Sequence, residues 1–243
     1  MTVELELRSV TYHYPGQSQP ALKDVTLGTS GGRRIALLGR NGSGKSTLLL
    51  ACNGIVRPQS GGVYLDCRPV AYDHASLCRL RRTVGVVFQN PDDQLFSASV
   101  AEDISFGPLN LGLSDGEARD RVATAAELCE ITHLLDKPTH ALSGGEKTRV
   151  ALAGVLAMDV EILIADEALA GLDPWMRHQV MEIFDKLSAQ GKTIVLATHD
   201  IGLARAWADT VVLMEGGTVC AVQPAAVFFA NPGLVARINP FDL

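Results

Sequence analysis

The chain has 243 residues, of which 47% are hydrophobic and 20% are charged. This composition is typical of a soluble globular protein with room for one large domain or two packed subdomains, and it excludes disordered and collagen-like chains. The 27 acidic and 21 basic residues give a net charge of −6, so the chain lacks the basic surface that a nucleic-acid backbone requires and we expect no nucleic-acid partner.

The predicted strands are typical of an α/β protein with a parallel sheet. The start, Val3-Glu-Leu-Glu-Leu7, alternates apolar and polar residues, and Gly16, Pro20 and the Gly31-Gly32 pair follow it, which predicts an antiparallel edge sheet. Five short apolar runs, each bounded by turn residues, predict strands buried on both faces. They are Ile35–Leu38, Val84–Phe88, Ile162–Ala165, Thr193–Ala197 and Thr210–Met214.

Helical patterns lie between and after these strands, and the stretch from about Pro91 to Met158 is largely helical. We predict that residues 1–89 and 159–222 form the core with its edge sheet, and that residues 90–158 form a helical subdomain inserted into it. Residues 223–243 would form a tail of one or two helices, with Val227-Phe-Phe229 and Val235 at apolar positions. The predicted helices are Lys45–Asn53, Asp115–Cys129, Glu146–Ala157, Trp175–Gln190 and Ile201–Ala208.

The sequence predicts neither a disulfide framework nor a membrane anchor. The start Met1–Leu7 is acidic where a signal peptide would be basic, and the most apolar stretch, Val150–Ala165, is too short to span a bilayer. We therefore expect any membrane contact to come through a partner protein. The cysteines contain no C-x-x-C pair and are expected to be reduced thiols packed as small hydrophobic side chains. They are Cys52, Cys67, Cys78, Cys129 and Cys220.

The segment from Gly39 to Ser46 fits the phosphate-loop pattern G-x-x-x-x-G-K-[ST] and lies between a predicted strand and a predicted helix. Its glycines allow backbone N–H groups to surround a β-phosphate, and the helix N-terminus adds positive potential. Lys45 would bridge the β- and γ-phosphates, and Ser46 would ligate Mg²⁺. The alternative is a glycine-rich turn that only caps a helix. The candidate nucleotide-binding residues here are Gly39, Arg40, Asn41, Gly42, Ser43, Gly44, Lys45, Ser46 and Thr47.

Two acidic residues, Asp166 and Glu167, follow the predicted strand Ile162–Ala165 at the edge where open α/β sheets bind ligands. Because neighbouring strand residues project in different directions, Asp166 can hold Mg²⁺ while Glu167 faces a water in line with the γ-phosphate. The metal would offset the repulsion between the carboxylates. The alternative is a strand that simply ends in a polar loop.

The segment Leu142-Ser143-Gly144-Gly145-Glu146 opens a predicted helix, and Ser143 with Glu146 satisfies the capping-box pattern. Two adjacent glycines also leave bare backbone N–H groups at a helix N-terminus, which is a second candidate anion site. Together with the phosphate loop and the carboxylate strand, this pentapeptide resembles the signature of ABC transporter nucleotide-binding subunits. The alternative is a purely structural cap.

The resemblance runs from about Val3 to Val222 and implies an ATPase with ATP and Mg²⁺ as cofactors. In such proteins two subunits pack head to tail, so Ser143, Gly144 and Gly145 of one copy would complete the ATP site on the phosphate loop of the other. All motifs are present in this chain, which implies a homodimer. The implied catalytic residues are Lys45, Gln89, Glu167 and His199, and the implied metal ligands are Ser46, Gln89 and Asp166.

The resemblance also implies roles for three residues at predicted strand ends. Tyr14 would stack on adenine, with Tyr12 the weaker candidate; the alternative is that both pack on the edge sheet. Gln89 would contact Mg²⁺ and the attacking water on a loop coupled to the membrane subunit, and His199 would contact the γ-phosphate. The remaining histidines show no metal-ligand spacing and are expected at the surface. They are His13, His74, His133, His140 and His178.

One segment departs from the family pattern. Ala170-Gly171-Leu172-Asp173 matches the D-loop, which crosses the dimer interface in such proteins. The family usually has Asp-Glu-Pro followed by Ser or Thr after the carboxylate strand, whereas this chain continues Ala168-Leu169. The proline and the hydroxyl are therefore missing, but no group assigned to the chemistry is.

The stretches Gln89–Phe96 and Glu102–Gly107 resemble the ATPases of energy-coupling-factor (ECF) importers, which take up vitamins, Co²⁺ and Ni²⁺. The implied partners are a transmembrane coupling protein and a substrate-binding membrane component, which would hold the chain at the cytoplasmic face of the membrane. Asp92 and Asp93 could receive arginines of the coupling protein; the alternative is a solvated acidic loop. Within this branch the chain is most similar to ATPases of cobalt importers, the CbiO type, with nickel and biotin importers as alternatives. No residue is expected to contact the transported solute.

Two other classes of protein share part of this site. ABC ATPases of DNA repair or chromosome structure have long heptad arms or a zinc motif, but fewer than 100 residues separate Ser46 from Leu142 here, and neither feature is present. A phosphate-loop kinase would leave the segment Leu142–Glu146 without a function. Both alternatives therefore explain less of the sequence than a transport ATPase does.

Overall fold

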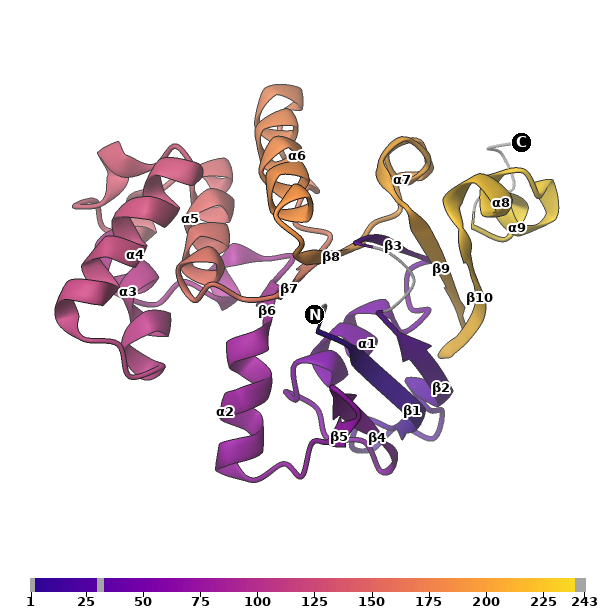
Figure 1. The fold of residues 1–243 in the computed structure, drawn as a ribbon. Coiled ribbons are helices and arrows are strands. Elements are labelled where there is room, and N and C mark those ends of the chain that lie inside the picture. The colour runs from indigo at the N-terminus through magenta and orange to yellow at the C-terminus, as the bar shows by residue number, and fades with distance from the viewer. Residues whose placement is uncertain (1–2, 30–32, 239–243) are drawn as a thin grey trace.

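A computed structural model of the chain describes residues 3–29 and 33–238 (Figure 1). The expectations for Met1, Gly31-Gly32 and residues 239–243 lie outside this range. The described chain contains a six-stranded sheet in the order β10-β9-β3-β8-β7-β6, parallel except for β10. The strands are β3 (Arg34–Leu38), β6 (Val84–Val87), β7 (Ile162–Asp166), β8 (Thr193–Ala197), β9 (Thr210–Glu215) and β10 (Thr218–Pro224). All five predicted buried strands are confirmed to within one residue at each end.

A second, antiparallel sheet has the order β2-β1-β4-β5. Leu5, Leu7 and Val10 of its central strand are buried, as the alternating pattern at the N-terminus predicts. The backbone N–H of Lys23 donates to the carbonyl of Gly217 across 2.8 Å, which ties this sheet to the hairpin of β9 and β10. The strands are β1 (Leu5–Tyr12), β2 (Leu22–Gly28), β4 (Ser60–Leu65) and β5 (Arg68–Pro69).

The first helix, α1 (Lys45–Cys52), lies between the two sheets. Its buried Leu48 and Leu49 belong to one apolar cluster with Leu7 of β1 and Ile164 of β7. Burying a leucine side chain stabilises a fold by about 1.5–3 kcal/mol, so this contact fixes α1 firmly against both sheets. The loop between β3 and α1 is thereby held at the carboxyl edge of the parallel sheet, where ligands bind in such sheets.

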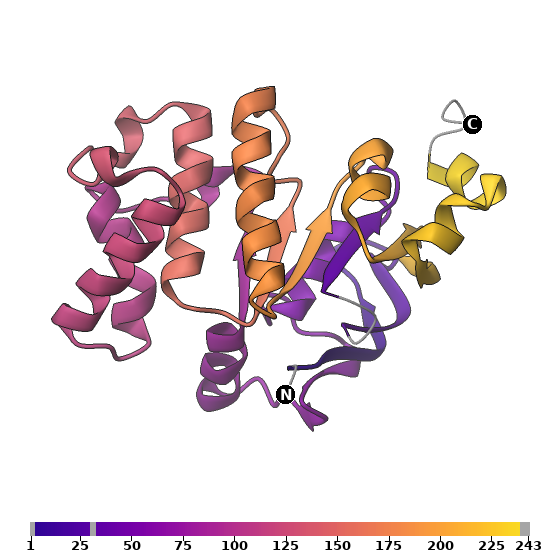
Figure 2. The same cartoon turned by 45° about the horizontal axis from the view of Figure 1, so that its top comes forward.

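The opposite face of the parallel sheet is covered by helices (Figure 2). Phe184 of α6 (Pro174–Ala189) is buried in one cluster with Leu196 of β8. The helices α7 (Ile201–Trp207), α8 (Ala225–Phe229) and α9 (Pro232–Ile238) pack against β3 and β9. In the tail, Phe228 and Val235 are buried, but Val227 is 55% exposed because the short helix α8 turns it outward. The expectation of an apolar position for Val227 is therefore wrong.

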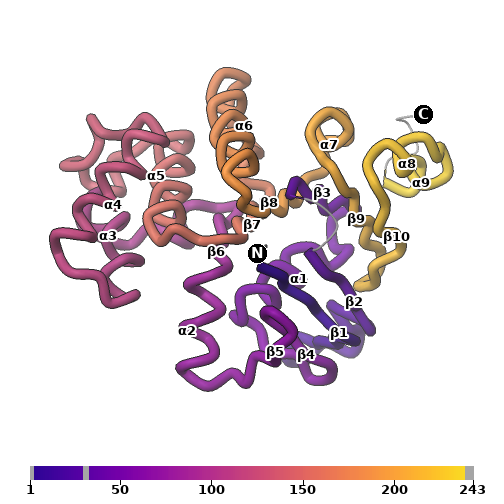
Figure 3. Tube along the Cα trace, in the orientation of Figure 1, coloured from indigo at the N-terminus to yellow at the C-terminus, as the bar shows by residue number. Residues whose placement is uncertain are grey.

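Every regular element between Pro91 and Ala157 is helical. We call α3 (Val100–Asn110), α4 (Asp115–Leu128) and α5 (Gly144–Ala157) the helical arm; they lie together at one side of the parallel sheet (Figures 1 and 3). Ile104, Val122 and Val150 form the apolar contact between the three helices. The additional elements here are α2 (His74–Thr83) before β6, and the 3₁₀ turns η1 (Pro91–Asp93), η2 (Thr132–Leu134) and η3 (Thr139–Ala141).

The expectation for the cysteines is right for two of them. Cys52 and Cys129 are buried, and burial raises the pKa of each thiol to about 12. Cys67, in contrast, lies exposed between β4 and β5, so it does not pack as a hydrophobic side chain.

The histidines outside the site lie where the sequence places them, at the surface. His74, His133, His140 and His178 are exposed, and His13 is half-buried. Over the described ranges 3–29 and 33–238, none of the helices has the length and apolar character needed to cross a bilayer.

Candidate functional site

The phosphate loop has the backbone that its glycines predict. Gly39, Gly42 and Gly44 have φ of 155°, 78° and 102°. A Cβ at Gly39 would lie 2.4 Å from the carbonyl oxygen of Met214, and one at Gly44 would lie 2.6 Å from that of Ala21. Any other residue at these two positions would therefore displace the loop, whereas Gly42 faces open space.

Lys45, the first residue of α1, points back into the loop and is only 6% exposed. Its ammonium donates to the carbonyl of Gly39 across 2.8 Å and to that of Arg40 across 3.4 Å. A buried ammonium ion needs such acceptors, and phosphate oxygens are stronger ones. Lys45 is thus placed to bind a phosphate that enters the loop.

Asp166 ends β7 beside Ser46 and is only 8% exposed. Burial raises the pKa of its carboxyl group, while a hydrogen bond from Ser46 lowers it. Its Oδ1 atom is buried and has no hydrogen-bond partner in the described part of the chain. An oxygen with no partner in a cluster of carboxylate, hydroxyl and amide groups fits a hard divalent cation. Ser46, Gln89 and Asp166 are therefore suitable ligands for Mg²⁺.

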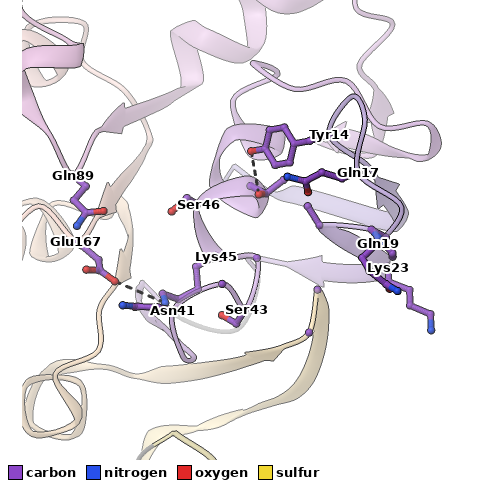
Figure 4. Close-up of a pocket in the computed structure, with 17 residues that line it drawn as sticks. Tyr14, Gln17, Gln19, Lys23, Asn41, Ser43, Lys45, Ser46, Gln89 and Glu167 are labelled. Atoms are coloured by element: carbon purple, nitrogen blue, oxygen red, sulfur yellow. Dashed lines mark hydrogen bonds and ion pairs between the residues drawn. The ribbon is translucent and has the colours of Figure 1, made fainter.

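Glu167, just after β7, contacts both the end of β8 and the start of α1. Its backbone takes the left-handed conformation, with φ of 47°, and its N–H donates to the carbonyl of Ala197 at the end of β8. Its carboxylate then lies 3.8 Å from the Lys45 ammonium and 3.5 Å from Nδ1 of His199. Figure 4 shows Gln89, Glu167 and Lys45 around the same open space. The structure thus brings together all four predicted catalytic residues.

This space is an open pocket of about 830 Å³, lined by residues of the phosphate loop from Asn41 to Thr47 and by Tyr14, Gln89 and Glu167. The hydroxyl groups of Tyr14 and Thr47 lie 3.2 Å apart, and the ring of Tyr12 packs edge-on against Tyr14. Tyr14, rather than Tyr12, lines the pocket. Sequence reasoning missed the rest of the lining, where no motif marks the residues: Gln17, Gln19, Pro20, Ala21, Lys23, Gly216 and Gly217.

Two residues predicted for the site, Arg40 and His199, do not line the main pocket. Arg40 directs its side chain away from the pocket: its Nε donates to the carbonyl of Ile238 in α9 across 3.4 Å. Only its backbone is therefore available to a phosphate. His199 does not line the main pocket but an adjoining one of about 150 Å³, which it shares with Glu167 and with Ala170 and Gly171 of the D-loop.

The residues Ser143–Gly145 lie outside the main pocket of their own chain, at the exposed N-terminus of α5. The predicted capping box is confirmed: Ser143 N–H donates to Glu146 Oε2 across 2.7 Å, and Glu146 N–H donates to Ser143 Oγ across 3.4 Å. A Cβ at Gly145 would lie 2.1 Å from Met176 Sδ, but one at Gly144 would meet nothing within 4 Å. A side chain at Gly145 would therefore have to displace the flexible end of Met176, whereas Gly144 faces open space.

The two residues that depart from the family pattern, Ala168 and Leu169 before the D-loop, pack into the protein interior. Ala168 and Leu169 are both buried, and Leu169 packs into the apolar cluster that contains α6. Asp173 then caps α6 by accepting from the backbone N–H groups of Trp175 and Met176. Burial of Ala168 and Leu169 therefore fixes the segment where the family has a stiff proline followed by a hydroxyl residue.

The family model with the description "ABC transporter" matches residues 22–170, which is more than half of the chain. The chain belongs to the ABC transporter family. Within this family it is an ATP-binding subunit with the ABC ATPase fold, and its enzymatic activity is ATP hydrolysis. The resemblance that the three sequence motifs indicate is thereby confirmed.

Among the relatives, the cobalt import ATP-binding protein CbiO of Rhodobacter capsulatus is 48% identical over 98% of this chain and 84% of its own length. The energy-coupling factor transporter ATP-binding protein EcfA2 of Methanospirillum hungatei JF-1 is 44% identical over 96% of this chain. This chain spans only 58% of the length of that archaeal protein.

Two solved structures resemble the whole fold. CbiO1 from Clostridium perfringens, described as part of the ABC transporter complex CbiONQ, has a TM-score of 0.81 and 41% identity over 98% of this chain and 95% of its own. A dimeric ATP-binding cassette in a post-hydrolysis state, bound to ADP and Pi, has a TM-score of 0.83 and 28% identity over 91% of this chain and 98% of its own.

Proposed function

We propose that two copies of this chain bind two MgATP at shared sites and that hydrolysis drives an ECF-type importer. The observation that supports shared sites is the position of Ser143–Gly145, exposed and apart from the pocket of their own chain. A helix N-terminus with bare N–H groups attracts phosphate, so a second copy facing the pocket would supply these groups to the γ-phosphate. The dimeric form of a similar cassette supports this arrangement.

The proposed chemistry follows from the strand-end residues. Lys45 and the loop N–H groups bind the β- and γ-phosphates, and Tyr14 stacks on the adenine. Glu167 orients the attacking water and accepts its proton, while Gln89 and His199 hold the water and the γ-phosphate. Ser46, Gln89 and Asp166 would hold Mg²⁺, which, when bound, supplies positive charge to the phosphates.

We expect Asp166→Asn to weaken metal binding while leaving nucleotide binding without metal unchanged. The neutral amide removes a charged oxygen ligand but also removes a buried charge, so the metal-free protein should be no less stable than wild type. Mn²⁺ affinity in the presence of ADP, measured by electron paramagnetic resonance, checks this prediction. Asp136→Asn, at an exposed position, is the matched control. Unchanged Mn²⁺ affinity of Asp166→Asn would remove Asp166 from the ligand set.

The partner in the membrane is proposed to dock in a groove of about 430 Å³ between β6 and the helical arm. Phe96 is 65% exposed and Phe106 is 50% exposed, and their rings lie edge to face with centroids 4.7 Å apart. Exposed aromatic pairs of this kind commonly serve as anchors in interfaces. A cytoplasmic helix of the transmembrane coupling protein would cover them and hold the chain at the cytoplasmic face of the membrane.

The two acidic residues beside this groove, Asp92 and Asp93, differ in their contacts within the chain. Asp92 Oδ1 lies 2.6 Å from the Lys147 ammonium of α5, so Asp92 is already paired within the chain. Asp93 is exposed and has no charged or hydrogen-bonded side-chain partner among the described residues. An arginine of the coupling protein would have to compete with Lys147 for Asp92, whereas it meets no such competitor at Asp93, so Asp93 is the better candidate contact.

We expect Asp93→Lys to leave hydrolysis by the isolated subunit within about twofold of wild type and to impair assembly of the importer. The introduced ammonium group would face the arginine of the coupling protein, and this repulsion between like charges costs several kcal/mol. Co-purification with the membrane components measures assembly. Asp115→Lys, exposed at the start of α4, is the control. Normal assembly and uptake by Asp93→Lys would show that the acidic turn is merely solvated.

The transported solute is proposed to be cobalt, on the basis of the similarity to a cobalt import ATP-binding protein. Nickel and biotin are the alternatives, because ECF importers of those solutes use similar ATPases. The deciding experiment purifies the membrane complex and measures ATP-dependent uptake of Co²⁺, Ni²⁺ and biotin into vesicles. The proposal predicts Co²⁺ uptake, and uptake of Ni²⁺ or biotin instead would reassign the importer without changing the role of this chain.

A further inference from the structure

Gln94 connects the parallel sheet to the helical arm through both ends of its side-chain amide. Its Oε1 accepts a hydrogen bond from the backbone N–H of Phe88, across 3.2 Å. Its Nε2 donates to the carbonyl of Ala151 in α5, across 3.0 Å. Phe88 directly precedes Gln89, and α5 begins directly after Ser143. One side chain therefore links the backbone at Gln89 with the helix of the signature residues.

Both hydrogen bonds are partly buried, so they are not readily replaced by water. The amide accepts through its oxygen and donates through its nitrogen; a carboxylate accepts only, and a leucine side chain does neither. A buried N–H or C=O group left without a partner costs about 1–3 kcal/mol. The link is therefore specific to glutamine at position 94.

The turn around Gln94 is fastened to the helical arm by further contacts. Asp92 pairs with Lys147, one helical turn after Ser143 in α5. Asp103 of α3 accepts hydrogen bonds from the backbone N–H groups of Phe96 and Ser97, across 2.9 and 2.8 Å. The turn thus moves with the arm.

On the side of the sheet, in contrast, the described residues show one side-chain hydrogen bond between this turn and the end of β6, the Phe88–Gln94 bond, beside the chain itself at Gln89–Pro91. Gln94 also lines the groove that holds Phe96 and Phe106. A displacement of the arm, or a partner helix in the groove, would reach Gln89 through this amide.

We propose that Gln94 is a positioning residue that keeps Gln89 in a fixed relation to α5. Gln89 serves the ATP site of its own chain, whereas Ser143–Gly145 at the start of α5 serve the site of the second copy. Gln94 therefore couples the two ATP sites of the dimer to each other. This inference rests on the proposed shared sites, but the hydrogen bonds that carry it are within one chain.

The test compares Gln94→Leu, which removes both hydrogen bonds, with Gln94→Glu, which keeps an acceptor for Phe88 and loses the donor to Ala151. Gln190→Leu is the matched control, because Gln190 is exposed at the end of α6 and makes no side-chain hydrogen bond among the described residues. The first measurement is hydrogen exchange of the Phe88 amide in the nucleotide-free chain. Exchange should become about tenfold faster in Gln94→Leu and stay near wild type in Gln94→Glu.

The second measurement separates positioning from folding and from simple nucleotide binding. The MgADP affinity of Gln94→Leu should match that of Gln190→Leu, because the phosphate loop is untouched. Its melting temperature should fall by no more than about 10 °C, the cost of two partly buried groups without partners, and the chain should stay folded at the assay temperature. The kcat should fall about three- to tenfold, as expected for the loss of one or two hydrogen bonds from the aligned state. The ATP concentration needed for dimer formation should rise by a similar factor, measured by light scattering with Glu167→Gln also present to block hydrolysis.

Unchanged Phe88 exchange in Gln94→Leu would overturn the inference, and so would faster exchange with kcat and dimerisation equal to the control. An equal loss of MgADP affinity and kcat would also overturn it, since that pattern indicates a general structural defect. Failure of Glu167→Gln alone to dimerise with ATP would contradict the proposed shared sites and, with them, the coupling of two sites. The Phe88 exchange would still show whether Gln94 fixes the strand end that leads to Gln89.

Discussion

Replacing Glu167 with glutamine is expected to slow ATP hydrolysis by about two to four decades, or about 3 to 5 kcal/mol of activation free energy. This is the usual contribution of a positioned general base. Glutamine has almost the same shape as glutamate but cannot accept the proton of the attacking water. MgATP should still bind, because Lys45 and the loop N–H groups that hold the phosphates do not depend on the carboxylate.

With hydrolysis blocked, the closed ATP-bound dimer should accumulate and be visible by light scattering. The control is Glu161→Gln, the same change at an exposed position just before β7. It should hydrolyse ATP at the wild-type rate and form no stable dimer. Wild-type turnover by Glu167→Gln would contradict the role of Glu167 as the base and would move that role to another residue near the pocket.

The ATP site is predictable from the sequence largely because its groups follow short apolar runs. Parallel strands end at the same edge of a sheet, so residues that directly follow them must lie close together. Asp166, Glu167 and His199 satisfy this condition, while Lys45 opens the helix that follows β3. The carboxylate of Glu167 lies 3.8 Å from the Lys45 ammonium and 3.5 Å from His199 Nδ1. The helix caps were also predictable, since a capping box depends only on residues three apart.

Two helices left weaker signals. The helix α2 is short and largely polar: only Leu80 is fully buried and Leu77 packs partly against the core, so its apolar face is narrow. The helix α3 contains Gly107 and Pro108, which usually disfavour helices; Pro108 has no N–H to donate to the carbonyl of Ile104, and its burial in the last turn offsets that loss. Sequence periodicity predicts a largely helical interval here but not these boundaries.

Side-chain partners far apart in the chain were not predictable. Lys147 pairs with Asp92 across 55 positions, and this pairing, rather than charge alone, distinguishes Asp92 from Asp93, although both are exposed. Likewise, the phosphate-loop pattern does not predict that the side chain of Arg40 turns toward Ile238 of α9. Both contacts depend on how separate helices are placed around the sheet, and local sequence patterns do not contain that placement.

A mixture of two inactive variants tests the shared sites directly. Lys45→Ala spoils the phosphate loop, and Ser143→Arg places a bulky side chain at the N-terminus of α5, where the γ-phosphate of the second copy would lie. Each variant alone should be nearly inactive, because both sites of its homodimer contain the lesion. Ser143→Arg also destroys the capping box of α5, so a control for the lost cap is needed. Ser114→Arg provides it, since Ser114 and Glu117 form the same capping box at the start of α4.

In a mixed dimer built head to tail, one site collects both lesions, while the other combines an intact Lys45 with an intact Ser143 from the opposite chain. ATPase activity should then recover to about a quarter of wild type if half the dimers are mixed and one site works alone. The two variants carry different affinity tags, so the mixed dimers can be isolated and assayed by themselves. A site completed within one chain predicts no recovery at any mixing ratio, because every chain contains a lesion. The exposed position of Ser143, outside the pocket that Lys45 lines, favours recovery.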